Sequence, residues 1–488
     1  MHTSMLFALK KRLWELRLPI LICLLFFIAY AVLSVVRHNH YGSFGYDLGI
    51  NDQVVWEYSR LLPPISTIGP NPGSLKLVNH VELIFALLSP FYWIWTNPLT
   101  LLLLEPLFFC VSGIAIFLLA KKRNLNIYLC FAILIGYLGF YGAQNAIWFD
   151  VHSVSFGASF LAWFIYFYQE KRTKLTVLFF LLAITAKENI AFITFFISLV
   201  YFIGRRDKQS FIYMLVSMAY TFFMFFVFFP HILHVPYQYQ NKEGLFSNLD
   251  IVALFDTQEK IRVIFYTLTS FGYLAVLNPL TLIPMLGDLA TYFVIGSDLT
   301  GAQGLFMQYR ISLTPLMAWA TISTVHKYKI LNTKWVALYL ILCTAFVQYS
   351  LHLPLSYLSK QWFWYESPSV KTINNVITNF IPQNAAIVSQ NNITPHISER
   401  KYIYTLFPDK KDFINNSPCG QKTCDWFRWA GKPEYLIIDT SKDWDIRHTL
   451  ANREDYLNGL KNLEKAGVVK IYKQEGTTTL YKVFKNPG

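Results

Sequence analysis

Residues 19–36 read PILICLLFFIAYAVLSVV, a run without a single charged side chain. A helix needs roughly 20 apolar residues to cross the hydrocarbon core of a bilayer, so this run predicts one transmembrane helix. The basic stretch KKRLWELR comes before it and no small-residue cleavage site follows, which favours an uncleaved span over a signal peptide. The whole chain is 54% hydrophobic and only 15% charged. These values are typical of a polytopic membrane protein.

Apolar runs of this kind recur until residue 353, and they predict an α-helical polytopic membrane protein with about 11 transmembrane helices. A shorter apolar segment, residues 81–95, contains Ser89 and Pro90 and is expected to form a juxtamembrane or re-entrant helix. The expected spans are residues 18–36, 99–120, 127–147, 153–168, 175–188, 189–204, 210–230, 261–277, 279–296, 309–325 and 335–353.

The basic residues indicate how the chain is oriented in the membrane. The net charge is +13, but lysine and arginine lie in short clusters between apolar runs, which argues against a nucleic-acid partner. With a cytoplasmic N-terminus, the clusters that begin at Lys121, Lys171, Arg205 and Lys327 all fall on the cytoplasmic side, as the positive-inside rule requires. We therefore expect a multi-pass protein of the inner (cytoplasmic) membrane with an external loop at residues 37–80.

The composition changes after residue 353, where apolar runs of spanning length end. We divide the chain into a transmembrane domain, residues 1–353, and a small soluble α/β domain outside the membrane, residues 354–488. The patterns predict helices in SPSVKTINNVITNFIP and NREDYLNGLKNLEKAG, strands in AAIVS, KYIYTL and EYLIIDT, and a final hairpin in VVKIYKQEGTTTLYKVF. No phosphate-binding motif occurs there. In an extracytoplasmic domain, Cys419 and Cys424 are expected to form a disulfide.

Polar side chains near or within the predicted spans are the candidate functional residues, because a charge at the centre of a bilayer costs about 2.5–3.5 kcal/mol on insertion scales. Acid or base chemistry suits the carboxylates, and phosphate binding suits the cations. The structural alternatives are a helix cap or solvated loop for the acids, an interfacial hydrogen bond for the first histidine, and a simple ion pair for Lys187 with Glu188. The candidates are Asp47 and Asp52 in YDLGINDQVVWEYSR, His80 and Glu82 in NHVEL, Asp150 and His152 in WFDVHSVSF, Lys187 and Glu188 in AITAKENIAF, and Tyr309 and Arg310 in GLFMQYRISLTP.

The ordered set of motifs YDLGINDQVVW, NHVELIF, WFDVHSVSF, LLAITAKENIAF and QYRISLTPL resembles the predicted membrane-protein family called domain of unknown function 2079. The family pattern FDLGI-x-DQ appears here with Tyr46 in place of phenylalanine, and its T-K-E appears as T-A-K-E. That family is similar to the GT-C glycosyltransferases, which take sugars from polyprenyl phosphates at the outer face of the membrane.

The resemblance implies a sugar transfer in which an acid of the first external loop activates the acceptor hydroxyl. It places Asp47 in that role, with Asp52 as a second acid, and it suggests Lys187 or Arg310 for the donor phosphate. The implied partners are a polyprenyl-phosphate sugar and membrane lipids. No cofactor is certain, and no metal ligand is assigned, although a divalent metal is possible; the acids of the loop lie five positions apart and form no D-x-D pair.

Two other functions fit the same residues. A non-enzymatic lipid or solute transporter, such as a flippase, would line its pathway with these charges. A structural protein of an envelope assembly would bury them in satisfied networks. The sequence favours transfer chemistry because most of the candidates gather at the predicted outer face.

Overall fold

The computed structural model describes residues 2–69, 73–78, 80–235, 237, 251–294, 302–408 and 426–487, with side chains from residue 16 onward. Within these ranges the chain forms two compact units, the helical unit (residues 1–33 and 104–358) and the mixed unit (residues 34–103 and 359–488). The loop at residues 37–80 therefore belongs with the C-terminal residues and not with the transmembrane helices. Cys419 and Cys424 lie outside the described residues.

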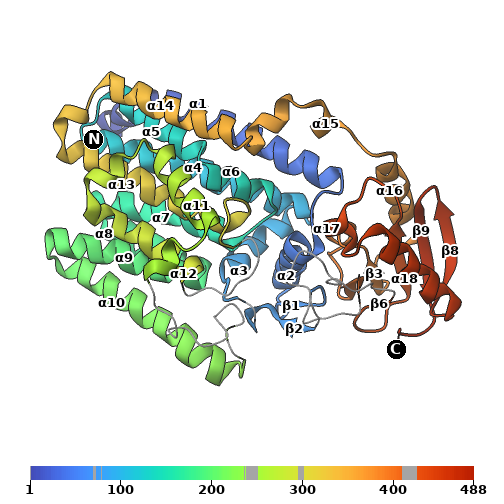
Figure 1. Cartoon of the computed structure of the whole chain (residues 1–488). Coiled ribbons are helices and arrows are strands. Elements are labelled where there is room, and N and C mark those ends of the chain that lie inside the picture. The colour runs from blue at the N-terminus through green and yellow to red at the C-terminus, as the bar shows by residue number, and fades with distance from the viewer. Residues whose placement is uncertain are drawn as a thin grey trace. The chain divides into compact units, whose positions relative to one another are not determined.

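The helical unit consists mainly of helices that overlap the predicted spans (Figure 1). Two of these spans, 127–147 and 261–277, are each divided into two helical segments. Helix α7 packs on α8, α8 on α9, and α9 on both α10 and α12, while α5 packs on α14. Their bounds are α4 Pro98–Lys122, α5 Ile127–Leu138, α6 Tyr141–Trp148, α7 Ser153–Gln169, α8 Thr173–Ala186, α9 Glu188–Arg205, α10 Lys208–Phe223, α11 Gln258–Ser270, α12 Ile283–Phe293, α13 Leu313–Lys327 and α14 Lys334–Ser350.

Five helical segments of the described chain are long and apolar enough to cross a bilayer. They are Leu16–Asn39 (within α1, His2–Asn39), Pro98–Lys122, Ile127–Trp148 (α5 and α6 together), Glu188–Arg205, and Lys208–Ile232, in which α10 continues as the π-helix Met224–Ile232. The other predicted spans form shorter helices. The segment 81–95 forms the short α3, Ile84–Leu88, which continues directly into a 3₁₀ helix, Ser89–Trp93.

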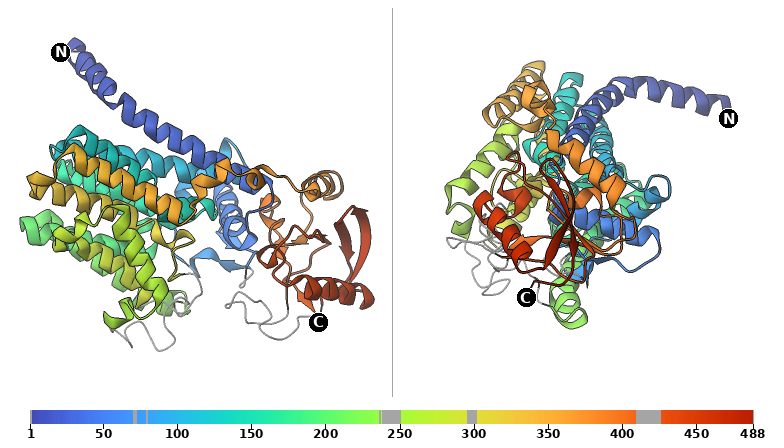
Figure 2. Two further views of the ribbon diagram at one scale, coloured as in Figure 1. Left: turned by 45° about the horizontal axis from the view of Figure 1, so that its top comes forward. Right: turned by 90° about the vertical axis from the view of Figure 1, so that its right-hand side faces the viewer.

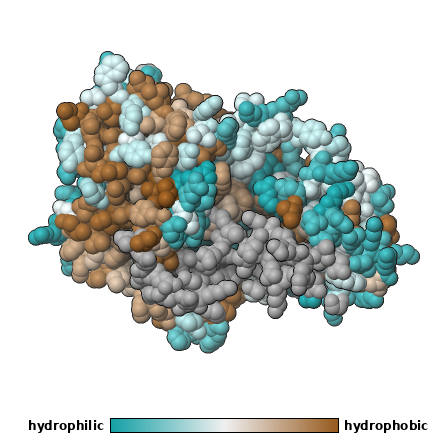
Figure 3. All heavy atoms as spheres, viewed as in Figure 1, coloured by the Kyte–Doolittle hydropathy of each residue, from teal (hydrophilic) through white to brown (hydrophobic). Residues whose placement is uncertain are grey.

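The surface of the helical unit is strongly apolar. On the face shown in Figure 3, hydrophobic residues gather over its helices. Helix α10 exposes a row of large side chains, with Met218 58% and Phe222 59% exposed. Exposing apolar surface to water costs about 25 cal/mol per Å², whereas contact with lipid chains carries no such cost. This surface fits a membrane protein.

The mixed unit contains a five-stranded sheet in the order β4-β3-β7-β9-β8. Strands β3 (Ile387–Ser389), β4 (Ile403–Thr405) and β7 (Tyr435–Asp439) are parallel, and the hairpin of β8 (Val469–Glu475) and β9 (Thr478–Val483) joins antiparallel to β7. Figure 2 shows the hairpin at the edge of this sheet. The predicted strands and hairpin of the C-terminal region match the structure.

Alternation along the strands buries both faces of the sheet. Leu436 and Ile438 pack in the cluster that contains Leu460 of α18 (Arg453–Lys465). Ile437 faces the opposite cluster with Ile373 of α16 (Pro368–Phe380). Side chains of successive strand residues point to opposite faces, so one strand contributes to both clusters.

The loop at residues 37–80 is bonded to this sheet through the edge strand β4. Thr67, next to the short strand β1 (Ile65–Ser66), donates its hydroxyl to the carbonyl of Ile403 at 2.6 Å and accepts the backbone N–H of Ile403 at 3.0 Å. Gln53, in helix α2 (Ile50–Ser59), donates to the carbonyl of Arg400 at 3.0 Å and accepts the Thr67 N–H at 2.9 Å. These bonds satisfy backbone groups that the edge of a sheet would otherwise leave open.

Candidate functional site: a polar cluster in the helical unit

The motif AITAKENIAF lies at a break between two helices. Helix α8 ends at Ala186 and α9 begins at Glu188, with Lys187 extended between them at φ −156° and ψ 147°. The side chain of Lys187 is only 8% exposed, and its ammonium has no hydrogen bond or ion pair with any described residue. Glu188 is fully buried and accepts the Tyr237 hydroxyl at 2.9 Å. The predicted ion pair between Lys187 and Glu188 does not form.

The motif QYRISLTP places an arginine in the interior of the same unit. Arg310, in the 3₁₀ turn Gln308–Arg310, is fully buried and donates to the backbone carbonyls of Gly304 and Ala302. Its guanidinium lies over the rings of Tyr292 at 4.8 Å and Phe293 at 5.1 Å. Among the described residues its Nη1 has no hydrogen-bond partner and the group has no ion pair.

Lys260, another buried cation of the same unit, has partners for its charge within the protein. It is 3% exposed, donates to the carbonyls of Ala253 and Phe293, and forms an ion pair with Asp256 at 2.8 Å. A buried charge needs such an anion because desolvation costs several kcal/mol. Among the described residues, Arg310 has the carbonyls and the rings but no anion within ion-pair distance.

Helix α12 brings two further polar residues to this place. Asp288 is fully buried and accepts the Ser312 hydroxyl at 2.7 Å through Oδ1, while its Oδ2 has no partner among the described residues. Tyr292, one turn later, stacks edge-on to Tyr309 with ring centroids 5.3 Å apart and accepts a hydrogen bond from Asn189 at 2.8 Å. Tyr292 lies within electrostatic range of Asp288, Arg310, Tyr309 and Glu188.

We call this set the α9–α12 cluster: Lys187, Glu188, Asn189, Asp288, Tyr292, Tyr309 and Arg310. Four of its members were predicted as site residues from two separate sequence motifs. Asp288, Tyr292 and Asn189 were not among the predicted site residues. Asp288 was detectable, because it is an acidic residue inside the predicted span 279–296 and intramembrane acids are functional candidates by default.

A second polar group of the helical unit contains the motif WFDVHSVSF. Asp150 is fully buried with φ +100°, a backbone conformation unusual outside glycine. The backbone N–H of His152 donates to Glu105 of α4 at 3.2 Å, and Asp150 interacts electrostatically with Glu105. The structure thus brings the two predicted residues, Asp150 and His152, together with a second acid, Glu105, from another helix.

The two predicted acids of the loop at residues 37–80 differ in burial. Asp47 lies half-buried in the single turn Gly45–Gly49. Asp52 is fully buried, with Oδ1 accepting from the Tyr92 hydroxyl and Oδ2 from the Ser398 hydroxyl at 2.6 Å. Asp47 is therefore the more exposed of the two acids, and both oxygens of Asp52 accept hydrogen bonds.

Burial also perturbs the titration of Asp52. It raises the pKa of the Asp52 carboxyl above its ordinary value of 3.8, although the hydrogen bonds from Ser398 and Tyr92 oppose the shift. Burial, with the nearby charge of Asp52, raises the pKa of Glu399 as well. The two carboxyls therefore resist being charged together.

The remaining loop candidates lie close to each other in sequence and in space. Glu82 is buried and forms an ion pair with Lys76 at 3.1 Å. His80 is half-buried, and its backbone N–H donates to the carbonyl of Lys76. This local ion pair gives Glu82 a structural role in addition to its predicted one in substrate binding.

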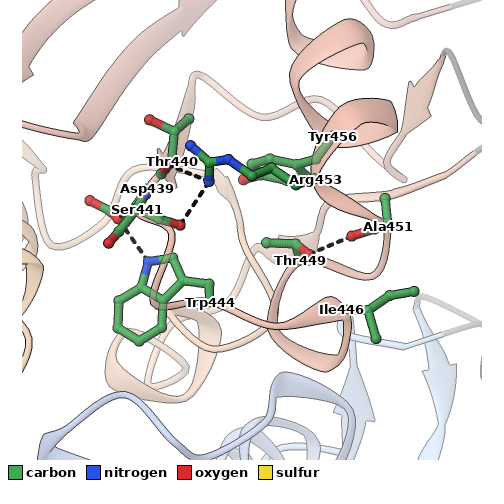
Figure 4. A pocket seen from close by; sticks show the side chains of 9 residues that line it. All are labelled: Asp439, Thr440, Ser441, Trp444, Ile446, Thr449, Ala451, Arg453 and Tyr456. Atoms are coloured by element: carbon green, nitrogen blue, oxygen red, sulfur yellow. Dashed lines mark hydrogen bonds between the residues drawn. The ribbon is translucent and has the colours of Figure 1, made fainter.

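The mixed unit contains a small cavity at the carboxyl end of β7 (Figure 4). It has a volume of about 30 Å³ and is lined by residues that include Trp444, Arg453 and Tyr456. Asp439 at its wall accepts from Ser441, Trp444, Thr477 and Thr478, so its oxygens are saturated. This space fits about one water molecule and is too small for a sugar. In the part of the chain that the structure describes, no three potential metal ligands come together.

The fold and the apolar surface define a polytopic helical membrane protein. The chain belongs to the family described as predicted membrane protein (DUF2079), whose match covers residues 37–455. Its fold is similar to the crystal structure of ArnT from Cupriavidus metallidurans in the apo state, with a TM-score of 0.58 and 10% sequence identity over 96% of this chain and 98% of that one. The family match confirms the expected DUF2079 resemblance, and the likeness to ArnT is a likeness of fold. No curated protein matches the chain in sequence.

Proposed function

We propose that this protein is a GT-C-type glycosyltransferase of the inner membrane that transfers a sugar from a polyprenyl-phosphate donor to an acceptor at the outer face. The observation that carries the proposal is the buried Arg310, whose Nη1 has no partner among the described residues. A guanidinium in a low-dielectric interior needs an anion, and its planar N–H groups suit a phosphate.

The surroundings of Arg310 favour a lipid phosphate as this anion. The guanidinium lies over two aromatic rings in a unit whose surface is apolar. A polyprenyl chain is soluble in lipid next to such a surface, whereas a free anion is not. The buried ammonium of Lys187 is a second positive charge of this unit. Its neighbour in sequence, Glu188, lies within electrostatic range of Tyr292. The fold likeness to ArnT supports a donor of the lipid-linked sugar class.

In the proposed reaction the acceptor hydroxyl oxygen bonds to the anomeric carbon of the sugar. The bond from that carbon to the phosphate oxygen breaks, and the polyprenyl phosphate leaves. The hydroxyl proton passes to a carboxylate, for which we propose Asp47 because it is half-buried while Asp52 is enclosed. Arg310 and Lys187 stabilise the charge on the departing phosphate.

Binding of polyprenyl phosphate to the purified protein in nanodiscs, followed by native mass spectrometry, tests the donor site. We expect wild-type protein to bind polyprenyl phosphate in preference to polyprenol, and Arg310→Gln to weaken binding by about 10- to 100-fold, since a hydrogen bond to a charged group is worth about 1.5–3 kcal/mol. The matched control is Arg262→Gln, which removes an exposed arginine of the same unit. Equal binding of phosphate and alcohol by the wild type would overturn the donor site.

The transfer step needs a separate measurement. Asp47→Asn should bind polyprenyl phosphate like the wild type and lose a cell-surface glycan in vivo. Unchanged glycans together with lost solute or lipid flux would instead identify a transporter.

A further inference from the structure

The α9–α12 cluster contains oxygen atoms that accept no hydrogen bond. Asp288 Oδ2 and Asn189 Oδ1 are both buried and, among the described residues, have no donor. The other end of each side chain is fixed, since Asp288 Oδ1 accepts from Ser312 at 2.7 Å and Asn189 Nδ2 donates to Tyr292 at 2.8 Å. A hydrogen bond to the other polar atom of the same side chain therefore fixes the position of each open oxygen.

Asp288 and Arg310 lie within electrostatic range of each other, yet no ion pair joins them in the described chain. A direct pair would satisfy both charges at once, and breaking a buried pair typically costs about 3–5 kcal/mol. Leaving one acceptor and one donor open in the same buried cluster is costly unless a ligand satisfies both. Such a ligand must carry an anion for Arg310 and O–H or N–H donors for Asp288.

Tyr292 lies next to both side chains that carry the open oxygens. It lies one helical turn after Asp288, so both side chains leave α12 on the same side. Its hydroxyl bonds to Asn189 of α9, and its ring lies under the guanidinium of Arg310. The open acceptors from two helices thus lie around the cation that we assign to the phosphate.

We propose that Asp288 and Asn189 form a sugar-recognition subsite that accepts hydrogen bonds from the hydroxyl or amino groups of the sugar attached to the donor phosphate. This inference rests on the proposed function and adds the residues that read the sugar. A site with buried unpaired acceptors discriminates strongly between sugars, because a sugar that lacks the matching hydroxyl leaves these acceptors without a hydrogen bond.

The test compares the binding of bare polyprenyl phosphate with that of polyprenyl-phosphate glucose, galactose, mannose and arabinose in nanodiscs. We expect at least one sugar to strengthen binding to the wild type by about tenfold or more, the effect of a hydrogen bond to a charged group. Asp288→Asn replaces the open acceptor with an N–H donor. It should abolish that gain, whereas the affinity for bare polyprenyl phosphate should not fall, because the substitution removes a negative charge near Arg310.

Two further variants keep the test decisive. Asn189→Leu removes the second acceptor with a side chain of similar size, and it tests the subsite if Asp288→Asn does not fold. Glu259→Gln removes an exposed acid of the same unit, paired with Arg262 at 2.6 Å, and should keep the full sugar gain. A deoxy analogue of the best sugar that lacks the hydroxyl bonded by Asp288 should bind the wild type no more tightly than bare polyprenyl phosphate does.

The possible failures are distinguishable. If the wild type does not bind bare polyprenyl phosphate, the donor site itself is wrong. If it binds the phosphate but no sugar adds affinity, or if Asp288→Asn and Asn189→Leu keep the whole gain, the sugar subsite is wrong and the phosphate site stands.

Discussion

A substitution of Gly142 by alanine tests the packing that positions Arg310. Gly142 lies in α6, and a Cβ at this position would approach the backbone carbonyl oxygen of Arg310 to 2.5 Å and its carbonyl carbon to 2.6 Å. Contacts below 3.0 Å essentially never occur for real Cβ atoms, and both atoms belong to the backbone, so one of the two segments must move.

Two opposing effects decide the sign of the change in stability. Alanine gains about 1 kcal/mol over glycine in a helix interior. Overpacking against a backbone that cannot rotate away costs typically 1–3 kcal/mol and occasionally more. We expect the clash to outweigh the propensity gain, with a net loss of about 1–2 kcal/mol of stability and weaker binding of polyprenyl phosphate, because the displaced turn carries the guanidinium.

The assay is the midpoint of thermal unfolding in detergent, followed by intrinsic tryptophan fluorescence. Gly204→Ala is the matched control, because it lies in helix α9 and its Cβ would meet nothing within 4 Å. The control should raise the midpoint or leave it unchanged, while Gly142→Ala lowers it. A Gly142→Ala protein as stable as wild type, with unchanged lipid binding, would refute the close approach of α6 to the Arg310 turn.

Two further outcomes are expected from other parts of the chain. The ring of His396 stacks on the rings of Tyr41 at 3.8 Å and His38 at 4.0 Å. Burial lowers the pKa of His396 from 6.5 to about 3. The buried neutral imidazole therefore contributes its full stability above pH 6.5 and loses it as the pH falls toward 3. His396→Phe should flatten the pH dependence of the unfolding midpoint in that window, where each pKa unit corresponds to about 1.4 kcal/mol; superimposable wild-type and variant profiles would contradict this. Asp207 caps α10 by accepting the N–H of Ser210 at 2.7 Å, so Asp207→Ala should cost about 1 kcal/mol in the same unfolding assay, whereas Asp207→Asn should retain most of the cap.

Hydropathy alone identified the helices of this protein because a membrane span depends on local composition. Each apolar run must satisfy its own backbone in lipid, so its helix does not depend on distant contacts. The C-terminal strands and helices were also predictable. Strands such as EYLIIDT are continuous apolar runs bounded by polar residues, and the helices carry a clear apolar stripe.

The loop stretch YDLGINDQVVWEYSR shows the limit of sequence reasoning. Asp47 and Asp52 look equivalent in sequence, five positions apart. Only the fold decides that Asp52 is enclosed by Tyr92 and Ser398 while Asp47 stays half-buried. The contact with Ser398 joins residues 346 positions apart, a separation that no local pattern encodes.

The α9–α12 cluster was decided in the same way. The sequence supplied its charges, since lysine, glutamate, aspartate and arginine within apolar runs are visible without a structure. Whether Lys187 pairs with Glu188, or Asp288 with Arg310, depends on a helix break, a 3₁₀ turn and the packing of three separate segments. The sequence therefore determined which charges enter the helical unit, and the tertiary structure alone decided which of them remain open to a ligand.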